Sequence, residues 1–109
     1  YFFKKIMYKI ITTSIDCADK AKDIAKQILF ERLSPCVQII SDINSLYTWN
    51  DQIEESKEFL IIIKCTSKNQ SDITSLVLEN HSYDVPEIIV TDFDIINPDY
   101  QKWFLENSN

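Results

Sequence analysis

The stretch from Cys36 to Cys65 reads CVQIISDINSLYTWNDQIEESKEFLIIIKC and consists of two long apolar segments joined by polar residues. The first segment ends at Trp49 and has strand composition, but it exceeds the usual strand of about 5–6 residues. Asp42 and Asn44 interrupt it, which predicts a bulge or bend. Residues 50–56 form a polar turn, and the run FLIII that follows is typical of a central strand covered on both faces or lying at an interface. The stretch therefore predicts a long antiparallel hairpin.

A strand and a helix precede this hairpin. Tyr8 to Ser14 is short, β-branched and apolar, as expected of a buried strand. Asp16 then offers an N-cap, and apolar residues recur at helical spacing over about 17 residues, with charged residues on the other face. Ser34-Pro35 ends the helix, because a residue before proline is pushed out of the helical region. The pattern predicts an amphipathic helix directly before the hairpin in the sequence.

A helix, a strand and a short helix follow the hairpin. Ser67 and Gln70 have the spacing of a capping box, which predicts a helix that runs out at Asn80 and His81. Residues 87–93 predict the last strand, with a proline at its entrance. A terminal helix starts at residues 97–99, where Asn-Pro-Asp places proline at an early helical position.

The order strand, helix, strand, strand, helix, strand predicts a ferredoxin-like (βαββαβ) antiparallel sheet of the α+β class, with a C-terminal helix. Nothing divides the chain, so we expect a single domain over residues 1–109, with residues 1–7 as an N-terminal extension. Two helices can cover only one face of the sheet, yet the strands look apolar on both. An uncovered apolar face and an overlong strand predict a symmetric oligomer.

Composition and charge argue against several classes of function. The chain carries a net charge of −6, which disfavours nucleic acid as a partner. It has no glycine, so glycine-rich phosphate loops and dinucleotide motifs are excluded, and Asn, Asp or Ser must occupy left-handed turn positions. Three cysteines without a Cys-x-x-Cys pair favour a reducing, cytoplasmic location. No apolar run reaches the roughly 20 residues that a membrane span needs.

Chemistry-bearing side chains are densest between Asn80 and Val90, which reads NHSYDVPEIIV and holds the only histidine. No second histidine is present to serve as a base beside a Ser or Cys nucleophile, so the sequence predicts a protein that is not an enzyme. His81 and Glu87 are the candidate metal ligands. The alternative for His81 is a structural role at the end of a helix.

Three segments together closely resemble the CutA divalent-cation tolerance family: SLYTWNDQIEESKEFLIIIK, HSYDVPEIIV and NPDYQKWF. The resemblance covers the chain from about Tyr8 to Phe104. It implies a ferredoxin-like homotrimer, similar in build to PII signalling proteins, whose long hairpins pair with neighbouring subunits. It also implies a role in tolerance of divalent metals, with no obligatory cofactor and weak binding of Cu²⁺ or another divalent cation.

The family's proposed copper ligands are a first-strand cysteine, a histidine and a glutamate after a proline. His81 and Glu87 match the latter two, whereas Thr12 and Thr13 occupy the first strand where the cysteine is expected. The resemblance thus implies His/carboxylate coordination of Cu²⁺, without the soft ligand that tight Cu(I) binding requires.

A second interpretation places the function in an inter-subunit cleft of a PII-like signalling or scaffold module that binds a small ligand or an unknown partner protein. Aromatic walls with a few polar groups are typical of ligand pockets, and the alternative is plain interface packing. The candidates for the cleft are Tyr47, Trp49, Glu54, Tyr83, Asp84, Tyr100 and Trp103, together with Glu87. Metal binding should depend on His81, whereas cleft binding should depend on Tyr47, Trp49 or Glu54.

Overall fold

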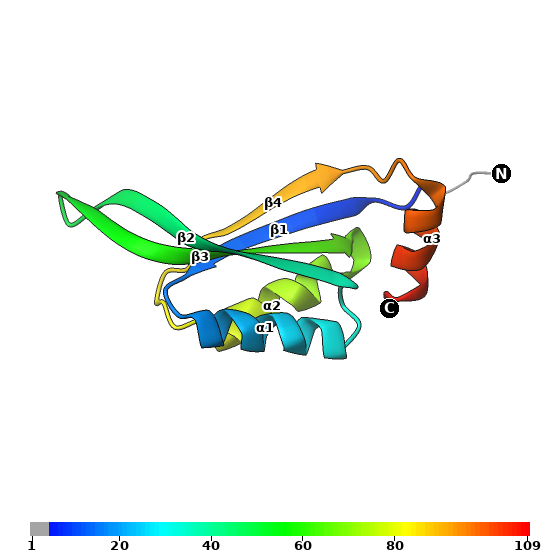
Figure 1. Cartoon of the computed structure of the whole chain (residues 1–109), viewed down its shortest axis with the longest axis horizontal. Coiled ribbons are helices and arrows are strands. Elements are labelled where there is room, and N and C mark those ends of the chain that lie inside the picture. Colours follow the sequence, from blue (N-terminus) through cyan, green and yellow to red (C-terminus); the bar gives the residue numbers. More distant parts are fainter. Residues whose placement is uncertain (1–4) are drawn as a thin grey trace.

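The computed structural model describes residues 5–109 and contains four strands, three α-helices and a short 3-10 turn (Figure 1). In chain order the elements are β1 (Tyr8–Ile15), α1 (Ala18–Phe30), β2 (Cys36–Trp49), β3 (Gln52–Thr66), the 3-10 turn (Ser67–Asn69), α2 (Gln70–Asn80), β4 (Ile88–Phe93) and α3 (Pro98–Glu106). The expected N-terminal extension falls on residues 1–7, of which 1–4 lie outside the described residues.

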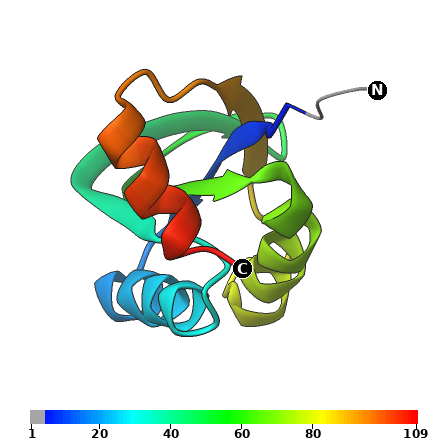
Figure 2. The same cartoon turned by 90° about the vertical axis from the view of Figure 1, so that its right-hand side faces the viewer.

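The strands form one antiparallel sheet in the order β2-β3-β1-β4. Helices α1 and α2 lie side by side on one face of it (Figure 2), and α3 lies at the end of the sheet away from the hairpin tip (Figure 1). This arrangement confirms the predicted ferredoxin-like class and C-terminal helix.

The core lies between the sheet and the two helices. Alternate residues of a strand face opposite sides of a sheet, and Ile11, Ile61 and Ile63 are fully buried against Ile24 and Ile28 of α1. The intervening residues on the other face, such as Ile62, stay partly exposed. The apolar run in β3 is therefore covered by helices on one face only.

The hairpin turn is tighter than the sequence predicted. Asn50 and Asp51 both have positive φ, 50° and 62°, as a two-residue turn between twisted strands requires. Strand β3 starts directly afterwards at Gln52, so the expected polar turn over residues 50–56 is wrong. The predicted bulge in β2 is confirmed by a register shift between Ile40 and Ile43.

Three predictions about helix ends are wrong. Helix α1 is capped at Cys17 rather than Asp16, and it has 13 residues instead of about 17. The side chain of Ser67 makes no capping bond, because a 3-10 turn precedes α2. Arg32 adopts a positive φ of 57° after α1, at a position where Asn, Asp or Ser was expected. Positive φ is uncommon for a residue such as arginine, whereas Asp42, Asn50 and Asp51 occupy the other positive-φ positions of the described residues as expected.

Thr13 offers a direct test of the packing under the helices. It is fully buried, it pairs with Ile61 and Ile88, and its Oγ1 has no hydrogen-bond partner. Thr13→Val keeps the shape and removes the unpaired hydroxyl, so we expect it to stabilise the fold by about 1–2 kcal/mol in urea unfolding. Thr12→Val on the opposite, partly exposed face is the control and should change stability by less than about 0.5 kcal/mol. A loss of stability in Thr13→Val would contradict this assignment.

Candidate functional site

One large cleft opens beside the hairpin, with a volume of about 710 Å³. This lies within the roughly 300–1,000 Å³ of small-molecule sites. We call it the hairpin cleft and define it by its lining residues: Ser14, Asn44, Ser45, Leu46, Tyr47, Trp49, Glu58, Tyr83, Asp84, Val85 and Glu87.

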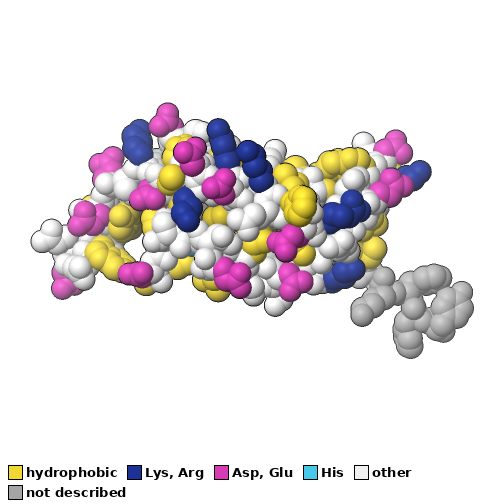
Figure 3. Space-filling model, turned by 90° about the horizontal axis from the view of Figure 1, so that it is seen from below, with side chains coloured by type: hydrophobic (Ala, Val, Ile, Leu, Met, Phe, Trp, Pro, Cys, Tyr) yellow, Lys and Arg dark blue, Asp and Glu magenta, His cyan; other side chains and the backbone are white. Residues whose placement is uncertain are grey.

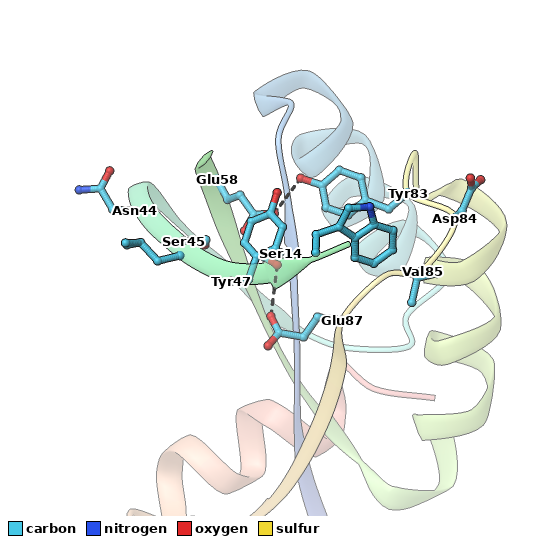
Figure 4. A pocket seen from close by; sticks show the side chains of 11 residues that line it. Ser14, Asn44, Ser45, Tyr47, Glu58, Tyr83, Asp84, Val85 and Glu87 are labelled. Atoms are coloured by element: carbon cyan, nitrogen blue, oxygen red, sulfur yellow. Dashed lines mark hydrogen bonds between the residues drawn. The ribbon is translucent and has the colours of Figure 1, made fainter. Parts of the chain in front are cut away.

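Four parts of the chain build the hairpin cleft. Strands β1 and β3 supply Ser14 and Glu58, the part of β2 beyond the bulge supplies residues 44–47 and 49, and the α2–β4 loop supplies residues 83–85 and 87. The bulge turns the end of β2, because an extra residue bends the bulged strand and increases its twist. Figure 4 shows Tyr47 and Tyr83 beside Glu58 and Ser14, with Asn44 and Asp84 pointing outwards.

Two hydrogen bonds orient the carboxylates of the cleft. The Tyr83 hydroxyl donates to Glu58 Oε2 over 2.7 Å, and the Ser14 hydroxyl donates to Glu87 Oε2 over 3.2 Å (Figure 4). Burial, followed by the hydrogen bond and the charge of Glu58, raises the pKa of Tyr83. Tyr83 therefore stays a hydrogen-bond donor throughout the physiological pH range.

Both ring nitrogens of His81 are engaged within the protein. Nε2 lies 2.8 Å from the Ser14 carbonyl oxygen, and Nδ1 accepts the backbone N–H of Tyr83 over 3.1 Å. An acceptor at Nδ1 fits the neutral tautomer that carries its proton on Nε2 and donates it to Ser14. The ring also packs on Tyr83, with centroids 4.8 Å apart. His81 thus ties the α2–β4 loop to the end of β1.

The predicted metal ligands are not part of a larger cluster. Among residues 5–109, no group of three or more His, Cys, Asp or Glu side chains has the arrangement of a metal site. Glu87 lines the cleft, whereas His81 does not and packs with its ring on Tyr83. A two-ligand site at His81 and Glu87 stays a prediction.

Five of the residues predicted for a ligand cleft lie together. Tyr47, Trp49, Tyr83, Asp84 and Glu87 all line the hairpin cleft. The remaining three predicted residues lie elsewhere in the single chain. Glu54 is in the exposed part of β3, and Tyr100 and Trp103 pack on each other in α3 with centroids 5.4 Å apart. Their place in an inter-subunit cleft stays a prediction.

Sequence reasoning missed Ser14 and Glu58. The sequence marked Ser14 only as the last residue of the first strand, and it gave no role to Glu58, which precedes the FLIII run. Glu58 is 7% exposed and lies inside β3, and a buried acidic residue is uncommon unless it is paired. The tyrosine that pairs with it is 25 residues away in sequence, so no local pattern could have identified the pair.

The helical face of the molecule has a different character. Acidic and basic side chains are interspersed there (Figure 3), as on an ordinary solvated surface. Within residues 5–109, no helix has the length and apolar character needed to span a membrane.

Comparison with known proteins identifies relatives over nearly the whole chain. The family described as CutA1 divalent ion tolerance protein matches residues 9–107. A Xenopus laevis "Protein CutA homolog" is 40% identical over 83 residues, covering 76% of this chain and 55% of the relative. The chain thus spans about half the length of that vertebrate relative. The Thermus thermophilus "Divalent-cation tolerance protein CutA" is 30% identical over 102 residues, covering 94% of this chain and 99% of the relative.

Solved structures agree with this result. The Thermus thermophilus structure superposes with a TM-score of 0.88 and covers 94% of this chain and 100% of its own. The CutA1 structure from Oryza sativa has a TM-score of 0.90 at 29% identity and covers 95% of each chain. A CutA from Archaeoglobus fulgidus, 29% identical with a TM-score of 0.87 over 93% of this chain and 98% of its own, carries the word periplasmic in its name.

Proposed function

The chain belongs to the CutA1 divalent ion tolerance protein family, and from this premise we propose that it acts in divalent-cation tolerance as a homotrimer that binds a small ligand in the hairpin cleft. The family is one of tolerance proteins and not of enzymes. One observation carries the proposal: the hairpin cleft gathers five of the residues that the sequence marked as a ligand site. Three aromatic side chains, Tyr47, Trp49 and Tyr83, with a few oriented polar groups, have the composition of such sites.

The trimer is part of the proposal because the chain leaves an apolar sheet face and a long hairpin uncovered. We also place the protein in the cytoplasm, which its three free cysteines support.

A tolerance assay with two aromatic variants tests the cleft. In cells that lack their own CutA protein, the wild-type chain should raise copper tolerance, and Trp49→Ser should lose most of that gain. Phe30→Ser is the control and should keep it, because Phe30 is also an exposed aromatic residue but lies at the end of α1, outside the cleft. Equal loss in both variants would argue against the hairpin cleft as the functional centre.

A second candidate function is weak copper(II) binding through His81 and Glu87. The close approach of the two side chains to one residue supports it: Ser14 bonds His81 through its carbonyl and Glu87 through its hydroxyl. Both nitrogens of His81 are already bonded, so copper must displace one hydrogen bond, and we expect low affinity for this reason.

Calorimetric titration of Cu²⁺ distinguishes this candidate. Glu87→Gln removes a ligand charge without touching the hydrogen bonds of His81, so we expect it to abolish saturable binding. Asp84→Asn makes the same charge change on an outward-pointing side chain and should leave binding intact. Unchanged binding in Glu87→Gln would exclude this copper site. Loss of binding in both variants would show that copper binding depends on the overall negative charge and not on this site.

A further inference from the structure

All residues of the hairpin cleft that carry a formal charge are acidic. Its ionisable lining comprises the carboxylates of Glu58, Asp84 and Glu87 and the hydroxyls of two tyrosines, with no Lys, Arg or His. Within the described residues, the ion pairs involve other side chains, and none includes a carboxylate of the cleft. The cleft is therefore a negatively charged cavity without a counter-cation.

Glu58 is the strongest sign of a missing cation. Its side chain is more than nine-tenths buried, and burying a carboxylate is costly unless a cation or several donors compensate it. Oε2 accepts from Tyr83, while Oε1 accepts no hydrogen bond among residues 5–109. Oε1 is also not among the buried polar atoms without a partner, so it remains open to the cavity. Glu58 Oε1 is thus an oriented acceptor that a ligand in the cleft can reach.

The walls around Glu58 suit an organic cation better than a bare metal ion. Hard divalent ions need about six or more oxygen ligands, and no group of three acidic, His or Cys side chains converges here in the described part of the chain. Tyr47, Trp49 and Tyr83 supply aromatic surface instead. Aromatic faces attract ammonium groups through cation–π interactions and pack against apolar bodies.

We propose that the hairpin cleft selects a small alkylammonium ligand, whose N–H groups are bound by Glu58 and Glu87 and whose apolar body lies against Tyr47 and Trp49. This inference rests on the proposed ligand-binding function of the cleft and adds the chemical class of the ligand. The Ser14 and Tyr83 hydroxyls hold one oxygen of each carboxylate, which leaves the other oxygen for the ammonium group.

Calorimetric titration with two probes of nearly the same shape tests the charge. Benzylammonium should bind, and neutral benzyl alcohol should bind at least about tenfold more weakly, because it lacks the charge-assisted hydrogen bonds. Glu58→Gln should weaken benzylammonium by at least about tenfold, since it removes the charge while its amide oxygen can still accept from Tyr83. Asp23→Asn makes the same charge change and is the control: it should bind as the wild type does, because Asp23 is an exposed residue of α1 that does not line the cleft.

The outcomes separate this proposal from the function of the cleft. Equal binding of amine and alcohol, lost for both in Trp49→Ser, would overturn the preference for a cation and keep the cleft as a ligand site. Absence of binding by benzylammonium, or unchanged binding in Glu58→Gln, would overturn the proposal as well. The tolerance assay with Trp49→Ser and Phe30→Ser tests the cleft independently of either probe.

Discussion

Replacing Phe104 by alanine should lower the free energy of unfolding by about 3–5 kcal/mol. Phe104 is fully buried and is the only residue of α3 that is. Its ring packs edge-on against Tyr8 with centroids 5.6 Å apart, and it also meets Phe93 and Tyr100. Phe104 is the buried apolar contact of α3 with β1 and β4, so its loss leaves a large cavity and weakens the packing of the helix on these strands.

Phe30→Ala provides the control for this prediction. Phe30 is the last residue of α1 and is 89% exposed, so its removal should change stability by less than about 0.5 kcal/mol. Urea unfolding of both variants, at one protomer concentration, measures the difference. Similar effects of the two substitutions would show that α3 contributes little to the fold.

The element order could be predicted from the sequence because it depends on local signals. The β-branched, apolar composition of β1, the helical spacing before Pro35, and Asn97 followed by Pro98 each act within a few residues. Asn97 does cap α3, accepting the backbone N–H groups of Asp99 and Tyr100. The starts of α1 and α2 were less predictable, because neither helix has a side-chain capping bond at its N-cap, and a 3-10 turn precedes α2.

The geometry of the site could be predicted only in part. Tyr83 and Glu87 stood out because polar and aromatic residues crowd one loop. The bonding of His81 depends on a carbonyl 67 residues away, which no local pattern contains. The burial of Glu58 could not be predicted either. A strand sequence does not reveal that Tyr83, in a loop 25 residues away, will lie against this side chain.

The largest effect should come from changing the uncovered sheet face. Strand β3 pairs with β1 only as far as Phe59, so its residues 52–58 pair with β2 alone and extend a molecule 55 Å long. A two-stranded ribbon is marginally stable in water. The ribbon and the sheet face beside it also expose Ile40, Leu46, Ile53 and Ile89 by 45%, 65%, 82% and 49%. This surface is the one that a trimer would cover, whereas the helical face is charged (Figure 3).

Ile62→Glu should therefore abolish the proposed trimer. Ile62 lies in central strand β3 between Thr12 and Gln38, on the face away from the helices, where a charge would be desolvated on assembly. Sedimentation should give the mass of three chains for the wild type and for Leu78→Glu, the matched change on the exposed side of α2, and one chain or unfolded protein for Ile62→Glu. Tenfold dilution of the wild type should reduce its unfolding free energy by about 2.7 kcal/mol per trimer, the value expected for three chains in equilibrium. A folded wild-type monomer in dilute solution, or a trimer that tolerates Ile62→Glu, would disprove this architecture, because the exposed hairpin would then be stable without a neighbour.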